Sequence, residues 1–90
     1  MKIPGARDNH HMRIRTLCFG AVGSIVGRHT FEIELADGRD TRDLVEHLLS
    51  AYPAISRHRL FLAVNQVHTP DTIVLNDGDE VAVFTAVSGG

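Results

Sequence analysis

The stretch that decides the fold is residues 75–85, Leu-Asn-Asp-Gly-Asp-Glu-Val-Ala-Val-Phe-Thr, in which a tight turn leads directly into an apolar strand. Asn and Asp side chains bind their own backbone, and Gly accepts a positive φ, so Asn76-Asp77-Gly78-Asp79 predicts a turn. The strand at residues 80–85 then alternates, with Val81 and Val83 on one face and Ala82 and Phe84 on the other. Both faces of this last strand are therefore apolar.

Four further strands are predicted upstream of this turn. Residues 13–19 are predicted as a strand that ends at Gly20, and residues 29–35 alternate with a period of two, which is typical of a half-buried strand. Shorter apolar strands are predicted at residues 60–64 and 67–69, on either side of an Asn65-Gln66 turn.

One long helix is predicted between Asp40 and Pro53. Asp40 or Thr41 can accept a hydrogen bond from a first-turn N–H, and Pro53 stops the helix because it pushes the residue before it out of helical geometry. A stripe at helical spacing gives the helix one buried face: Leu44, Val45, Leu48, Leu49 and Tyr52. Residues 20–27, rich in glycine, are interpreted as a short helix or a turn. One helix laid across a mixed sheet of four to five strands belongs to the α+β class.

Strand parity predicts an apolar patch on the sheet face that the helix does not cover. One set of alternate residues in each strand must pack under the helix, and the patch follows if that set holds Ile14, Cys18, Val81 and Val83. The residues that then point the other way are Leu17, Phe19, Ala82 and Phe84. Exposed patches of this kind usually mark protein contacts. The alternative is that the loop at residues 20–28 folds over them.

Composition bounds the class of protein. Ninety residues make one domain, and a formal net charge of −2 argues against nucleic acid as the main partner. No apolar run is long enough to span a membrane, and a single cysteine excludes an internal disulfide. We expect a cytoplasmic protein with a disordered leader at residues 1–11, a folded domain at 12–85 and a flexible tail at 86–90.

No residue pattern indicates catalysis or metal binding by this chain alone. The six histidines lack the spacing of a ligand set, and Cys18, in the middle of a strand, is expected to stay protonated. Gly20, Gly23 and Gly27 are not followed by the Lys-Ser/Thr of a phosphate loop. The cluster Arg57-His58-Arg59 is either a solvated turn or a contact for an acidic partner.

The terminal pair Gly89-Gly90 is different, because it presents an acyl carbon with no side chain around it. Five extended residues after the last strand could reach roughly 17 Å, far enough to enter the active site of another protein. Glycine suits a narrow channel because it has the smallest cross-section and no Cβ.

Several segments together resemble the small, sulfur-carrying subunit of molybdopterin synthase, a ubiquitin-like family. They are Phe19-Gly20 with Gly27, Asp40-Thr41 before Leu44 and Leu48, Ala63-Val64-Asn65-Gln66, residues 75–82, Phe84 and Val87-Ser88-Gly89-Gly90. The likeness spans residues 12–90 and is most specific in the C-terminal block. It implies a β-grasp fold.

The resemblance also implies a cycle of activation at the terminal carboxylate. An E1-like adenylyltransferase activates Gly90 with ATP, and a sulfur donor protein converts it to a thiocarboxylate. The tail, with Gly89, then enters the large subunit of molybdopterin synthase and delivers sulfur to cyclic pyranopterin monophosphate. The implied contacts with partners are Leu17, Phe19, Ala82, Phe84, Val87 and Ser88. The chain itself is implied to bind no cofactor, since ATP is used by the activating partner.

The sequence departs from the family at three places. Gly23-Ser24 stands where Arg-Glu is usual, Thr85-Ala86 where two prolines are common, and His68 where an apolar residue is usual. Three alternatives stay open: a thiamine-type sulfur carrier, a ubiquitin-like covalent modifier, and an interaction module with an inert tail. Thiamine-type carriers pass quickly from the first strand to the second, so the insert at residues 20–29 favours the molybdopterin type.

Overall fold

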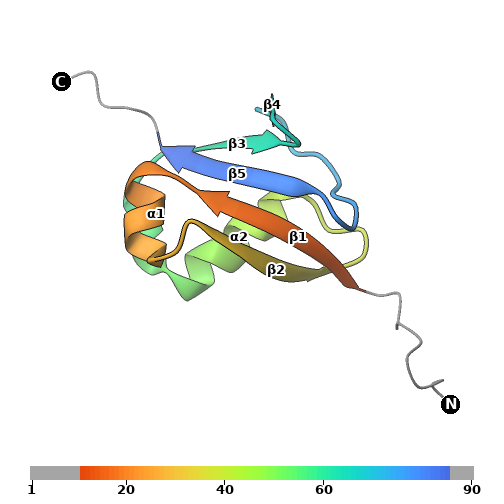
Figure 1. Ribbon diagram of the computed structural model, residues 1–90, viewed down its shortest axis with the longest axis horizontal. Coiled ribbons are helices and arrows are strands. Elements are labelled where there is room, and N and C mark those ends of the chain that lie inside the picture. The colour runs from red at the N-terminus through yellow and green to blue at the C-terminus, as the bar shows by residue number, and fades with distance from the viewer. Residues whose placement is uncertain (1–10, 86–90) are drawn as a thin grey trace, which may run out of the picture.

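The computed structural model describes residues 11–85, in which a five-stranded sheet is combined with one long helix (Figure 1). The elements in chain order are β1 (His11–Cys18), α1 (Gly20–Val26), β2 (Thr30–Ala36), α2 (Thr41–Ala51), the 3-10 helix η1 (Pro53–Arg57), β3 (Leu60–Val64), β4 (Val67–His68) and β5 (Glu80–Thr85). The predicted strands and the long helix are confirmed. The predictions for residues 1–10 and 86–90 lie outside the described residues, and β1 begins at His11, one residue before the predicted start of the domain.

The sheet is mixed, and its order is β2-β1-β5-β3-β4. The first and last strands are parallel neighbours, with Thr16 opposite Val81 and Cys18 opposite Val83. The pairs β1–β2, β5–β3 and β3–β4 are antiparallel. A parallel pair needs a crossover, and here α2 supplies it across one face of the sheet. This is the predicted ubiquitin-like β-grasp fold.

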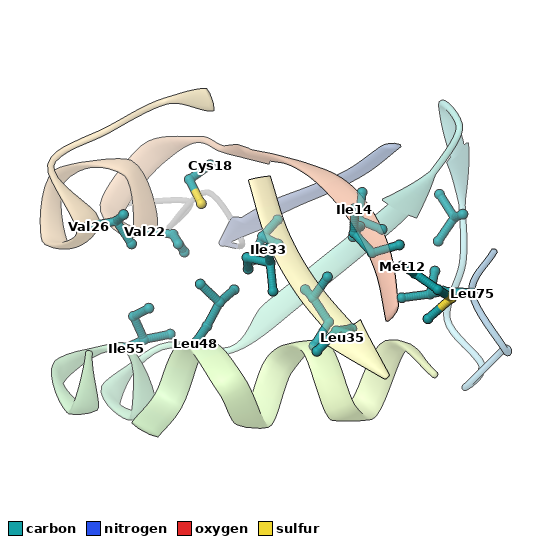
Figure 2. Close-up of a cluster of buried hydrophobic side chains, with 14 residues drawn as sticks. Met12, Ile14, Cys18, Val22, Val26, Ile33, Leu35, Leu48, Ile55 and Leu75 are labelled. Carbon is teal, nitrogen blue, oxygen red and sulfur yellow. The ribbon is translucent and has the colours of Figure 1, made fainter. Parts of the chain in front are cut away.

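The core lies between α2 and one face of the sheet. Leu44 and Leu48 of α2 are buried against the strands, as the predicted stripe requires. Figure 2 shows Val22 and Val26 of α1 on the same side, above Leu48 and Ile55. The short helix α1 therefore closes one end of the core.

The start of α2 is fixed by a reciprocal cap. Asp40 accepts a hydrogen bond from the Asp43 N–H at 2.9 Å, and the Asp43 carboxylate accepts one from the Asp40 N–H at 3.0 Å. Of the two capping residues that the sequence allowed, the structure uses Asp40. These hydrogen bonds favour the charged carboxylate, and the backbone donor from Asp43 is the main reason why the pKa of Asp40 is lowered.

The ambiguous glycine-rich segment is a helix, and Gly23 explains how it fits. Gly23 is buried, and a Cβ at this position would lie 2.9 Å from the carbonyl oxygen of Cys18 and 3.2 Å from Nδ1 of His29. Such a contact with a backbone atom is too short for any side chain. Gly23 therefore lets α1 pack directly against the end of β1.

Two turns are tied together beside β5. Asn65 and Gln66 both have positive φ, as a two-residue hairpin between β3 and β4 requires. The side chain of Asn65 donates to the Asp79 carboxylate and accepts from the Glu80 N–H, both at 3.0 Å. This bridge sets the entry of β5 into the sheet.

Candidate functional site: the aromatic patch on the open face

The open face of the sheet, defined as the face turned away from α2, holds the residues that parity assigned to it. Ile14, Thr16 and Cys18 of β1 are fully buried on the core face. By contrast, Leu17 is only partly buried, and Phe19, which follows β1 in extended conformation, is 48% exposed. The predicted parity is confirmed. The alternative that residues 20–28 cover the patch is wrong, because α1 packs against the core through Val22 and Val26 instead.

Phe61 of β3 enlarges this surface and was missed from the sequence. Its ring stacks on that of Phe84 in β5, with a centroid distance of 6.0 Å and an interplanar angle of 23°. On its other side lies the His68 ring, at 6.3 Å. We call the whole set the aromatic patch: Leu17, Phe19, Phe61, Ala63, Ala82 and Phe84. The signal for Phe61 was weak, since all five residues of β3 are apolar and alternation cannot tell its two faces apart.

The other half of the open face is charged, and its arginine and glutamate side chains pair with one another. The Arg13 and Glu34 side chains approach to 3.9 Å, as do those of Arg15 and Glu80. Exposed pairs of this kind add little stability, but they remain hydrated and are costly to cover with an apolar partner. A docking protein would therefore gain most of its binding free energy over the aromatic patch.

A hollow of about 370 Å³ lies beside the patch, between the first turn of α2 and the outer edge of β3. Phe61 and His68 form part of its wall, together with Thr41 and Pro70. Because β4 is two residues long, it pairs only with Ala63 and Val64 and leaves the start of β3 uncovered by a strand. The patch thus continues from the open face around the edge of the sheet.

The patch borders the end of β5. Thr85 lies opposite Leu60 of β3, and its hydroxyl oxygen comes within 3.2 Å of the position that a Cβ on Gly20 would take. The strand therefore finishes between the start of β3 and the junction of β1 with α1. The predicted site residues Val87, Ser88, Gly89 and Gly90 lie outside the described residues. The structure brings together the other four, Leu17, Phe19, Ala82 and Phe84.

Cys18 lies on the opposite, core face of the sheet, behind the aromatic patch. Burial raises the pKa of the Cys18 thiol, and the nearby Arg28 guanidinium offsets only part of that effect. A protonated, buried thiol is a poor nucleophile. Within residues 11–85, no three or more His, Cys, Asp or Glu side chains gather closely enough to hold a metal ion. In the same part of the chain, no helix is both long and apolar enough to cross a membrane.

Residues 17–90 match the ThiS family. A relative from Mycobacterium tuberculosis named molybdopterin synthase sulfur carrier subunit is 39% identical over 82 residues, which cover 88% of this chain and 99% of that protein. A relative with the same name from Chlamydomonas reinhardtii is 36% identical over 83 residues, covering 88% of this chain and all of that protein.

Solved structures share the fold. The HVO 2177 protein of Haloferax volcanii superposes with a TM-score of 0.80 at 21% identity, covering 96% of this chain and 99% of that one. A chain from the complex of subunits 1 and 2 of the molybdopterin-converting factor of Helicobacter pylori superposes with a TM-score of 0.56 at 21% identity. The match covers 88% of this chain and all of that one.

Proposed function

Because this chain belongs to the ThiS family, we propose that it is the sulfur carrier subunit of a molybdopterin synthase. The observation that carries the proposal is the near full-length match to relatives of that name. The position of the aromatic patch beside the end of β5 supports it. A carrier of this kind needs a docking surface next to the strand that leads to its reactive end.

The proposed chemistry takes place at Gly90. A carboxylate is a poor acyl donor, so its oxygen first attacks the α-phosphate of ATP and pyrophosphate leaves. Hydrosulfide released by a donor protein then attacks the carbonyl carbon, AMP departs with the electron pair of the C–O bond, and loss of the S–H proton leaves Gly90 as a thiocarboxylate. The thiocarboxylate gives its sulfur to cyclic pyranopterin monophosphate, and hydrolysis returns the carboxylate of Gly90.

The proposed partners are three proteins that meet the same end of this chain in turn. They are an E1-like adenylyltransferase, a sulfur donor protein, and the large subunit of the synthase. We assign docking to the patch residues Leu17, Phe19, Ala82 and Phe84, with Phe61 added. Val87, Ser88 and Gly89 would thread the channel that leads to the partner's active site. A cytoplasmic location stays a prediction.

Mass spectrometry of the intact chain tests this function directly. After incubation with the activating enzyme, ATP and the sulfur donor, the mass should rise by the difference between one sulfur and one oxygen. Adding one residue after Gly90 should abolish the shift, since misplacing the reacting carbon by about 1 Å can cost on the order of a hundredfold in rate.

Two outcomes would contradict the proposal. An unchanged mass under conditions that charge a known carrier would exclude sulfur transfer. Covalent adducts between Gly90 and lysines of other proteins, without a thiocarboxylate, would favour the ubiquitin-like modifier. The extended variant should keep the parent's melting temperature, which separates loss of chemistry from loss of fold.

A further inference from the structure

The charges of the domain are segregated along the sheet axis, although the sequence as a whole carries a net charge of −2. The end at which β1 and β5 finish is built from residues 18–30, 51–60 and 84–85. These segments contain three arginines and two histidines, and no Asp or Glu. Every carboxylate of the described chain lies in another segment. We call the three arginines of this set, Arg28, Arg57 and Arg59, the cationic end.

The topology places these cations on both sides of the last strand. In the sheet order β2-β1-β5-β3, Arg28 comes just before β2 and Arg59 just before β3, so the two flank the ends of β1 and β5. Thr85 pairs with Leu60, the neighbour of Arg59. β5 therefore ends between positive charges.

The three arginines are exposed and remain uncompensated within the described residues. The ion pairs of residues 11–85 are made by Arg13, Arg15 and Arg39. Arg59 lies instead over the Phe61 ring, 5.6 Å from its centroid, and Arg28 over the Phe31 ring at 4.5 Å. A guanidinium held on an aromatic face keeps its outward N–H groups free for a partner.

From this arrangement we infer that the cationic end recognises an acidic rim around the channel that receives the tail, on the large synthase subunit. The inference rests on the proposed function and assigns a partner chemistry to it. Arg59 joins the two surfaces, because it packs on Phe61 of the aromatic patch and stands beside Thr85. The patch supplies apolar contact area, whereas the cationic end orients the approach so that the tail meets its channel.

Charge of this kind acts mainly on the rate of association. The screening length is about 8 Å at physiological ionic strength and about 3 Å at 1 M salt. Steering by the cationic end should therefore disappear at high salt, while the apolar contact remains.

Association with the purified large subunit, followed by stopped-flow, tests the inference. Arg57→Glu/Arg59→Glu should slow association about tenfold at low salt, and the rates of parent and variant should converge near 1 M salt. Arg59→Lys keeps the charge and should associate nearly as fast as the parent. The matched control is Arg39→Glu, an exposed single reversal in the turn after β2, at the end of the sheet away from the cationic end. It should associate as fast as the parent, whereas the single variant Arg59→Glu should associate more slowly.

The outcomes separate the inference from the function on which it rests. If the parent binds but the double variant associates at the parent's rate, or if Arg39→Glu slows association as much as Arg59→Glu does, the acidic rim is wrong and the carrier function stands. If the parent does not bind the large subunit at all, the proposed function fails and the inference falls with it. Equal melting temperatures of all variants confirm that folding is not the variable.

Discussion

The two faces of the sheet are made by the same strands, yet they differ in almost every physical respect. On the core face, Ile14, Cys18, Val81 and Val83 are fully buried beneath the helices. On the open face, Phe84 and Ala82 alternate with those valines but remain partly accessible. Neighbouring positions in one strand thus serve stability on one side and contact on the other.

The difference between the two faces shows where an apolar side chain adds less to the free energy of unfolding. A buried side chain such as Val83 gains the full transfer free energy, about 1.5–3 kcal/mol. The Phe61 and Phe84 rings are partly buried, so each gains part of that free energy and leaves some apolar surface that favours association. These two rings therefore serve both the stability of the domain and its contact surface.

The largest expected effect is on the core face. Leu48→Ala should lower the free energy of unfolding by about 2–5 kcal/mol, because it removes buried area and leaves a cavity under β1 and β5. Urea denaturation of parent and variant measures this. Equal midpoints would mean that α2 does not pack through Leu48 and would remove the contrast between the faces.

The next effect tests the open face. Phe84→Ala should weaken binding to the large subunit by about 2 kcal/mol or more, as interface aromatics do. It should cost only about 1 kcal/mol of stability, mainly through the lost stacking on Phe61. Calorimetric titration and a melting curve on the same sample give both numbers.

The adjacent Val83→Ala is the matched control for this substitution. It truncates a smaller side chain, yet it should cost more stability than Phe84→Ala, because Val83 is fully buried. The opposite order of stabilities would place Phe84 in the core and contradict the open face.

A smaller effect concerns how the stability of the fold depends on pH. The pKa of Asp40 is lowered in the folded chain, chiefly by the Asp43 N–H, so its charged form stabilises the fold above its unfolded pKa of about 3.9. That contribution is lost as the pH falls through the lower, folded pKa. The advantage of the parent over Asp40→Asn should therefore be constant near neutrality and shrink below about pH 4. Denaturation curves between pH 2 and pH 7 would show it; a difference independent of pH would contradict the charged cap.

The smallest expected effect is on the reactivity of thiols and leaves the stability of the fold unchanged. The native Cys18 thiol, buried and with a raised pKa, should react with a thiol reagent only when the domain opens. A second cysteine from Ala82→Cys on the open face should react at once. Rapid modification of two thiols in that variant would show that the two faces are equally accessible.

The sequence indicated the faces of β1 because Arg13 and Arg15 alternate there with Ile14 and Thr16. Both faces of β5 are apolar, so its residues alone did not decide which face lies in the core. The sequence could not assign the faces of β3, where Leu60 to Val64 are all apolar, and so Phe61 was missed. It left α1 ambiguous, because the fit of Gly23 against the Cys18 carbonyl depends on a tertiary contact. The cationic end was visible only as the separate cluster at residues 57–59, since Arg28 joins it through the sheet order. The roles of Gly89 and Gly90 stay predictions.

The parallel pairing of β1 with β5 also determines how the domain bears a mechanical load. β1 begins at one end of the sheet and β5 finishes at the opposite end, so tension between His11 and Thr85 acts along both strands. The four residue pairs from Arg15–Glu80 to Cys18–Val83 are then sheared together rather than opened one after another. A pull on Thr85 against His11 therefore meets resistance from all four pairs at once, and β5 does not peel away from its end.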